Sequence, residues 1–167
     1  VMSNKFEILM HQLDMPLGMR NSEAFLNAEI EKVLVHKVSR VWEFHFSFAN
    51  ILPIEIFREL QKRLAQEFSK TGNQAIFEIH CQNPQVSDEL LQAYYQLAFE
   101  EGPCASHGFK SLYQDLQVHL DGDKLLIEGA STIDTEHFRK NHLPNLSRQL
   151  VKYGFPQLTC QVQHSDE

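Results

Sequence analysis

Histidine is the residue type in this chain that most invites a chemical interpretation, because the neutral imidazole ring is a common ligand of zinc and other transition metals. The chain has nine histidines in 167 residues, and none lies in an HExxH motif. His137 and His142 have the spacing i, i+5 in a segment that contains Pro144, so they do not share one face of a regular helix. His80 and Cys81 are neighbours in an extended segment and point to opposite faces of it. We expect solvated or packed histidines and no metal site.

Cysteine, aspartate and serine chemistry can be tested in the same way. The three cysteines, Cys81, Cys104 and Cys160, show no CxxC spacing, which predicts free thiols in a reducing cytosol. Cys81 and Cys160 fall on the apolar faces of expected strands, where a buried thiol packs as a small hydrophobe. Asp121 to Asp123 lack the further oxygen ligands of a calcium loop, and the chain has no GxSxG elbow and no glycine-rich phosphate loop. We therefore predict no catalytic residue and no cofactor.

The composition describes a folded chain with an acidic balance. Hydrophobic residues make up 43% of the chain, which is enough to form a core. The formal net charge is -7, so a nucleic-acid contact would need a local basic patch. No apolar segment approaches the roughly 20 residues that span a bilayer, and no signal peptide is visible. We expect a cytoplasmic protein without a membrane partner.

The first half of the chain predicts helix, short turn, two strands, helix and strand. Phe6 to Leu13 show helical spacing after a possible Ser3 cap, and Pro16 and Gly18 close this run. Ser22 can cap a short turn, and an extended pattern begins at Ile30. The clearest strand has four aromatic residues on one face: Trp42, Phe44, Phe46 and Phe48. The helix after Pro53 has an apolar stripe of Phe57, Leu60, Leu64 and Phe68 and ends near Gly72. A strand follows at residues 75–81.

The second half repeats this order. Ser87 can cap a helix that Gly102 and Pro103 stop, and a short turn then carries Phe109 and Leu112. Two further strands, with apolar residues at alternate positions, flank the tight-turn dipeptide Asp121-Gly122 as a β-hairpin. A final helix is expected after Asp134 as N-cap, and Pro144 should kink or split it. Its apolar residues are Phe138, Leu146, Leu150 and Tyr153. A last strand follows, with Leu158, Cys160 and Val162.

Together these elements predict an α+β protein of two consecutive small αββαβ units, each a mixed three-stranded sheet packed by helices. The repeat is one of element order, since identity between the halves is low. We expect the boundary near Asn83 to Ser87, which gives units at 1–84 and 85–167.

One local cluster in this acidic chain combines basic and aromatic side chains around the first hairpin. This candidate interaction surface consists of Lys32, His36, Lys37, Arg40, Trp42 and His45. The alternative is that Trp42 belongs to the apolar face with Phe44 and that the charged residues solvate the turn.

The stretch from His36 to Phe48, followed by Leu52, Pro53 and a helix, resembles the start of PolC-type DNA polymerase III alpha subunits of low-GC Gram-positive bacteria. Gly154, Phe155 and Pro156 resemble the same region. The resemblance spans essentially the whole chain and includes none of the short catalytic motifs of the polymerase.

If this resemblance holds, it implies that the chain precedes an OB-fold, a PHP domain interrupted by a proofreading exonuclease, and the polymerase palm, so that the catalytic aspartates lie elsewhere. It also implies two N-terminal domains, the first similar to the alpha-binding C-terminal domain of the clamp-loader tau subunit and the second KH-like. The chain has no GxxG loop, which a KH domain that clamps nucleic acid would present.

These observations leave two main functional hypotheses. The first is a non-catalytic module that docks the polymerase to a replisome protein such as tau. The second is a module that binds single-stranded or primer-template nucleic acid through Trp42, Lys37 and Arg40, by stacking and phosphate contact. A metal hydrolase built from scattered histidine and aspartate residues is a distant third.

Overall fold

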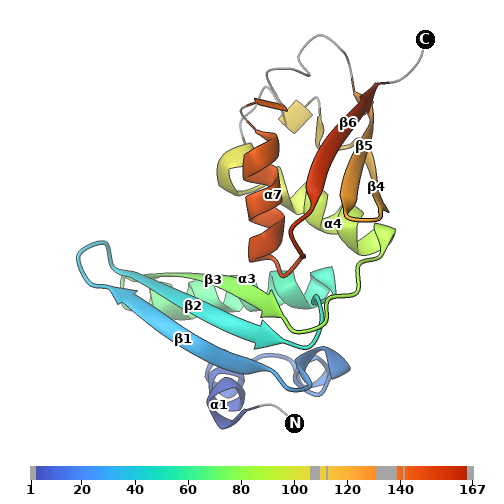
Figure 1. Ribbon diagram of the computed structural model, residues 1–167. Helices are drawn as coiled ribbons and strands as arrows, with labels where there is room; N and C mark the ends of the chain where they lie inside the picture. Colours follow the sequence, from blue (N-terminus) through green and yellow to red (C-terminus); the bar gives the residue numbers. More distant parts are fainter. Residues whose placement is uncertain (1–2, 106–109, 112, 131–138, 141, 165–167) are drawn as a thin grey trace. The chain divides into compact units, whose positions relative to one another are not determined.

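The computed structural model describes residues 3–105, 110–111, 113–130, 139–140 and 142–164, and the chain divides into two compact units, Val1–Gln85 (unit 1) and Val86–Glu167 (unit 2) (Figure 1). Each unit contains a three-stranded sheet with one antiparallel and one parallel pairing, together with helices. The α+β prediction of two similar units is therefore confirmed. The KH-like description of unit 2 stays a prediction.

Unit 1 begins with α1 (Asn4–Gln12), which the sequence predicts from its capping residue. The Ser3 hydroxyl accepts a hydrogen bond from the backbone N–H of Phe6. At the other end Asp14 takes a left-handed conformation, φ 55°, and the N–H groups of Asp14 and Met15 donate to the carbonyls of His11 and Met10. These bonds satisfy the last carbonyls of the helix and turn the chain sharply.

Two short helical turns follow α1. The first, α2 (Leu17–Arg20), is not predicted, because Gly18 was expected to close the preceding run. Pro16 instead stands immediately before it, where its fixed φ suits a helix start. The second is η1 (Glu23–Phe25), a 3-10 turn in which Ser22 accepts from the N–H of Ala24, as the sequence predicts.

The sheet of unit 1 has the order β1-β2-β3. Strands β1 (Glu29–His36) and β2 (Val41–Phe48) form an antiparallel hairpin, and β3 (Gln74–Cys81) returns parallel to β2 after α3 (Ile54–Ser69). Figure 1 shows the turn of the hairpin extending beyond α1. A parallel neighbour requires such a crossover, and the helix supplies it.

The core of unit 1 is a cluster of phenylalanine rings on one face of β2. Phe6 of α1 makes edge-to-face contacts with Phe25, Phe46 and Phe48 at centroid distances of 5.2 to 5.7 Å. Phe57 of α3 lies 5.2 Å from Phe77 of β3. Edge-to-face pairs of this kind contribute about 0.5–1.5 kcal/mol each beyond the area that they bury. The aromatic alternation of β2 thus fixes which face of the sheet the helices cover.

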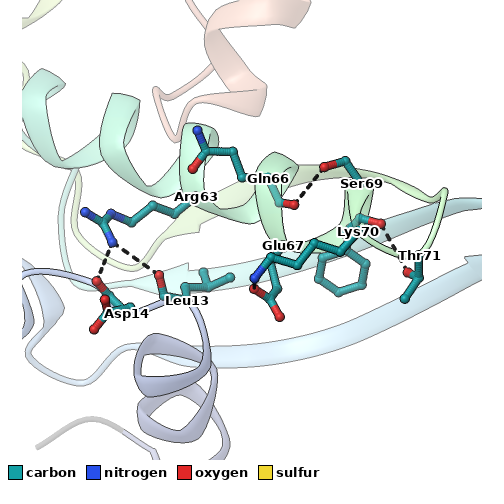
Figure 2. A network of polar contacts seen from close by, with 9 residues as sticks. Leu13, Asp14, Arg63, Gln66, Glu67, Ser69, Lys70 and Thr71 are labelled. Carbon is teal, nitrogen blue, oxygen red and sulfur yellow. Dashed lines mark hydrogen bonds and ion pairs between the residues drawn. The ribbon is translucent and has the colours of Figure 1, made fainter.

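Arg63 links α3 to the end of α1 (Figure 2). Its guanidinium donates to the carbonyl oxygens of Leu13 and Asp14, and its Nε donates to the carboxylate of Glu59 one helical turn away. A cation at the C-terminal end of a helix also interacts favourably with the helix dipole. Arg63 is therefore a structural residue of unit 1.

Unit 2 repeats the architecture with α4 (Asp88–Ala98), β4 (Gln117–Asp121), β5 (Lys124–Ala130), α7 (Leu143–Lys152) and β6 (Thr159–His164), and like unit 1 it has a 3-10 turn before its hairpin, η2 (Gly102–Cys104). The sheet order is β4-β5-β6. Ser87 caps α4 by accepting from the N–H of Leu90, as predicted. Gly122 has φ 63° in the tight turn between β4 and β5, where glycine adopts a left-handed conformation without strain.

Pro144 lies where the last helical segment is split, as the sequence predicts. Residues 139–140 are helical and His142 lies in a turn, and Pro144 then lies in the first turn of α7, where its missing N–H has no helical partner to lose. The expected N-cap Asp134 and the apolar residues Phe109, Leu112 and Phe138 lie outside the described residues.

Four buried tyrosine residues pack among the leucines in the core of unit 2. Tyr94 of α4 packs against Tyr153 and Phe155 at centroid distances of 5.2 and 5.4 Å. The buried Tyr95 hydroxyl donates to the carbonyl oxygen of Tyr113 at 2.6 Å. This bond satisfies a buried hydroxyl group that would destabilise the core if it had no partner.

Candidate interaction surface

One face of the unit 1 sheet has no phenylalanine and carries charged side chains. We call it the open face, and it consists of Lys32, Leu34 and His36 of β1, Val41, Glu43 and His45 of β2, and Ile76, Glu78 and His80 of β3. All of these residues are exposed or half-buried, whereas Phe44, Phe46 and Phe48 on the opposite side of β2 are buried. The strand register arranges them in rows, of which Leu34–Glu43–Ile76 and Lys32–His45–Glu78 are two.

Imidazole and carboxylate groups alternate across the open face. The Glu43 carboxylate lies 2.6 Å from Nε2 of His45 and 3.8 Å from Nε2 of His36. The second ring nitrogen of His45 lies 3.7 Å from Glu78. Each of these two histidines therefore has a carboxylate beside its ring.

A shallow depression of about 210 Å³ lies on the same face, lined in part by Glu31, Lys32, His45, Glu78 and His80. Nδ1 of His80 lies 3.4 Å from the Glu31 carboxylate. Among the described residues no group of three histidine, cysteine or acidic side chains is placed to hold a metal ion. His36, His45 and His80 of this face each lie beside a glutamate carboxylate.

Three of the six residues predicted as an interaction surface share the open face. Lys32 and His45 are cross-strand partners, and His36 stands at the end of β1 beside the turn. Lys37 is exposed in the turn itself.

The other two predicted residues have structural contacts. Arg40 has φ 59° in the turn, and its guanidinium donates to the carbonyl oxygen of Thr71 at 2.7 Å. Trp42 lies on the apolar face, 5.2 Å from the ring of Phe68 of α3. The side chains of Trp42 and His45 therefore point to opposite faces of β2, as the alternative interpretation of Trp42 expects. A binding role for this cluster stays a prediction.

Sequence reasoning missed the acidic partners of the histidines. The alternation that places the aromatic residues on one face of the strand also predicts Glu43 on the other face. Glu78 and His80 reach the open face only because β3 pairs with β2, and Glu31 lies beside His80 next to the bulge in β1; no local pattern along the chain shows these contacts.

Unit 2 has a groove of about 580 Å³ between α4 and β4, with Asp88, Gln92, Gln96, His119 and Glu128 among its lining residues. Two of the α4 side chains bind the outer edge of β4. Gln92 accepts from the N–H of Val118 and donates to the carbonyl of Leu116, both at 2.9 Å, and Asp88 accepts from the N–H of Leu120 at 3.0 Å. The side chains of a helix therefore occupy the positions of a neighbouring strand.

The cysteines lack the properties of nucleophiles. Burial raises the pKa of Cys81 and Cys160 to about 12 and that of Cys104 to about 11. Since the thiolate is the reactive form, thiols with these pKa values are inert at neutral pH.

Across the described part of the chain, no helix is long and apolar enough to cross a bilayer.

Comparison with protein families shows the family to which the chain belongs. Residues 5–79 match the family described as DNA polymerase III polC-type N-terminus I, and residues 93–167 match DNA polymerase III polC-type N-terminus II. The chain belongs to the PolC-type DNA polymerase III family. The two matched segments fall one in each unit and follow the order that the resemblance implies.

Similar PolC-type proteins come from streptococci. The chain is 96% identical over 166 residues to the DNA polymerase III PolC-type of Streptococcus sanguinis (strain SK36) and 63% identical over 165 residues to that of Streptococcus pneumoniae serotype 2 (strain D39 / NCTC 7466). It is 49% identical over 166 residues to the protein of Streptococcus pyogenes serotype M5 (strain Manfredo). Each alignment covers 99% of this chain and 11% of the relative. No solved structure matches the chain.

Proposed function

We propose that this chain is the non-catalytic N-terminal portion of the replicative DNA polymerase III alpha subunit of the PolC type, and that unit 1 docks it to another replisome protein. The whole protein would be a DNA-directed DNA polymerase with a 3'–5' exonuclease, acting in the cytoplasm. The clamp-loader tau subunit is the partner to test first. The open face is the observation that carries the docking role, because it leaves one side of a sheet exposed in a family of replication proteins.

The chemistry of the open face favours a protein partner over a phosphate backbone. Glu43 and Glu78 stand among the basic side chains, and carboxylates at these positions repel phosphate groups. Leu34 and Ile76 are 39% and 41% exposed on either side of Glu43. Apolar side chains bordered by charged residues of both signs are typical of protein interfaces.

Trp42 argues in the same direction. A tryptophan that stacks on a base must present its ring to solvent. Here the ring is half-buried against Phe68, on the face opposite to His45. We therefore expect Trp42→Ala to lower the free energy of unfolding of unit 1 by about 2 kcal/mol, since it removes a half-buried aromatic side chain. Urea denaturation followed by circular dichroism would measure this loss.

The docking role can be tested with purified tau and a matched pair of variants. Ile76→Lys places a charge on the open face, and Val151→Lys places the same charge on an exposed apolar position of α7, where Val151 is 36% exposed. We expect the first variant to weaken tau binding at least tenfold in biolayer interferometry and the second to leave it unchanged. If a full-length PolC-type relative binds tau and this chain does not, the docking proposal is wrong.

Oligonucleotide binding is the competing outcome. Salt-dependent affinity for single-stranded or primer-template DNA that is lost in Trp42→Ala, with the fold intact, would replace docking by nucleic-acid binding as the function of unit 1. Absence of binding at low salt would remove that alternative.

A further inference from the structure

The outer edge of β1 has no strand beside it among the described residues. There β1 pairs with β2 on one side only, and seven of its eight residues are exposed. Three consecutive apolar residues lie on it, with Val33, Leu34 and Val35 exposed by 36%, 39% and 45%. Soluble proteins normally protect edge strands from pairing by covering them or placing charges along them. An apolar edge of this kind is a template for a further strand.

The edge strand of unit 2 shows what protection looks like in this chain. The outer N–H groups of Val118 and Leu120 in β4 are bound by the side chains of Gln92 and Asp88. No side chain in the described residues makes an equivalent bond to β1. Of these two hairpins, only that of unit 1 leaves its edge strand available.

Two features of β1 restrict what can pair with it. The register shifts between Ile30 and Lys32, so that the regular edge runs from Lys32 to His36. Glu29 and Glu31 lie toward the start of the strand, with Lys32 after them, and His36 and Lys37 lie at its end. An antiparallel neighbour with the same order brings acidic residues to the basic end and basic residues to the acidic end.

We propose that β1 pairs antiparallel with β1 of a second copy of this chain, with Leu34 on the two-fold axis. In this register Val33 of each copy stands opposite Val35 of the other, and the apolar residues at the centre cover one another. Glu31 of each copy comes within reach of Lys37 of the other. The two sheets of unit 1 then form one continuous sheet across the axis. A second copy is the occupant because the apolar centre of β1 and the pair of Glu31 with Lys37 match their own copies in this register, in which Lys32 stands opposite His36.

This inference goes beyond the docking role and is separable from it. Pairing uses the backbone edge of β1, whereas docking uses the open face across all three strands of unit 1. Leu34 and Ile76 discriminate between the two surfaces, because both neighbour Glu43 on the open face with nearly equal exposure but stand on opposite edge strands.

Disulfide trapping tests the two-fold axis directly. Leu34→Cys places two thiols opposite each other, within the range that a disulfide between adjacent strands bridges. We expect mild oxidation of the whole chain to give a reducible dimer in Leu34→Cys, and Ile76→Cys and the unsubstituted chain to remain monomeric on non-reducing gels. Equal cross-linking of both variants would indicate random collision or pairing by the other edge, and would overturn the proposal.

Analytical ultracentrifugation of the unsubstituted chain tests the same interface without substitution at the axis. We expect a concentration-dependent dimer that Val35→Lys shifts to monomer and Ile76→Lys does not. A chain that sediments as a monomer at every concentration would overturn the proposal, whether or not the cysteine variants fold. Tau binding by such a monomer would leave the docking role standing.

Discussion

Gln92 provides the sharpest test of how this chain protects a sheet edge. Its side-chain amide makes two hydrogen bonds to the outer edge of β4, one to the N–H of Val118 and one to the carbonyl of Leu116. Gln92→Leu keeps the approximate size of the side chain and removes both bonds. Gln96→Leu is the matched control, because Gln96 is one turn further along α4, is half-buried and lines the same groove.

The magnitude follows from the number of bonds lost. A neutral hydrogen bond contributes about 1 kcal/mol net, and a donor or acceptor left partly buried without a partner adds to the loss. We expect Gln92→Leu to lower the free energy of unfolding of unit 2 by about 2 kcal/mol, and Gln96→Leu to change it by less than about 0.5 kcal/mol. In a unit of this size the first change corresponds to a fall in Tm of roughly 8–16 °C.

The chain contains its own probes for the two units. The single tryptophan, Trp42, is in unit 1, and all four tyrosines are in unit 2. Urea denaturation followed by tyrosine signals therefore reports unit 2, and tryptophan fluorescence reports unit 1. Amide exchange adds a local measurement, since the N–H of Val118 should exchange faster in Gln92→Leu. If both variants lose the same stability, or if exchange at Val118 is unchanged, α4 does not protect the edge in the way proposed.

Further predictions concern stability and thiol reactivity. Arg63→Met should lower the free energy of unfolding of unit 1 by about 1–2 kcal/mol in urea denaturation, because it removes bonds from a charged donor to the end of α1; Lys62→Met, which loses only an exposed ion pair, should cost less than about 0.5 kcal/mol. The hydrogen bond from Arg63 lowers the pKa of Glu59 below its ordinary 4.5. The stability that the ionised Glu59 carboxylate contributes is therefore fully present above that value and is lost as the pH falls through the lowered pKa. Arg63→Met should reduce this loss of stability at acidic pH. The raised pKa values of Cys81 and Cys104 predict slow labelling by a maleimide at pH 8 in the native protein and fast labelling in urea; rapid native labelling would contradict their burial.

The helices and strands were predictable wherever a single local rule applied. Ser3, Ser22 and Ser87 each accept the hydrogen bond expected of a capping residue, and the glycine of Asp121-Gly122 takes the left-handed turn. Proline positions were harder to interpret, because a proline that breaks the interior of a helix also fits the first turn of one. Pro144 follows the break between residues 139–140 and α7 and lies in the first turn of α7, and Pro16 precedes a short helix that no periodic pattern predicts.

The two-unit α+β order and the family could be inferred without a structure, since both follow from the succession of elements and from residue identity along the chain. The composition of the surfaces could not be inferred in this way. Trp42 and His45 lie close in sequence, yet strand alternation sends them to opposite faces, and packing against Phe68 holds the tryptophan there. Glu78 reaches His45 because β3 crosses over to lie beside β2. Partners on different strands are set by long-range pairing, which a local pattern along one strand does not encode.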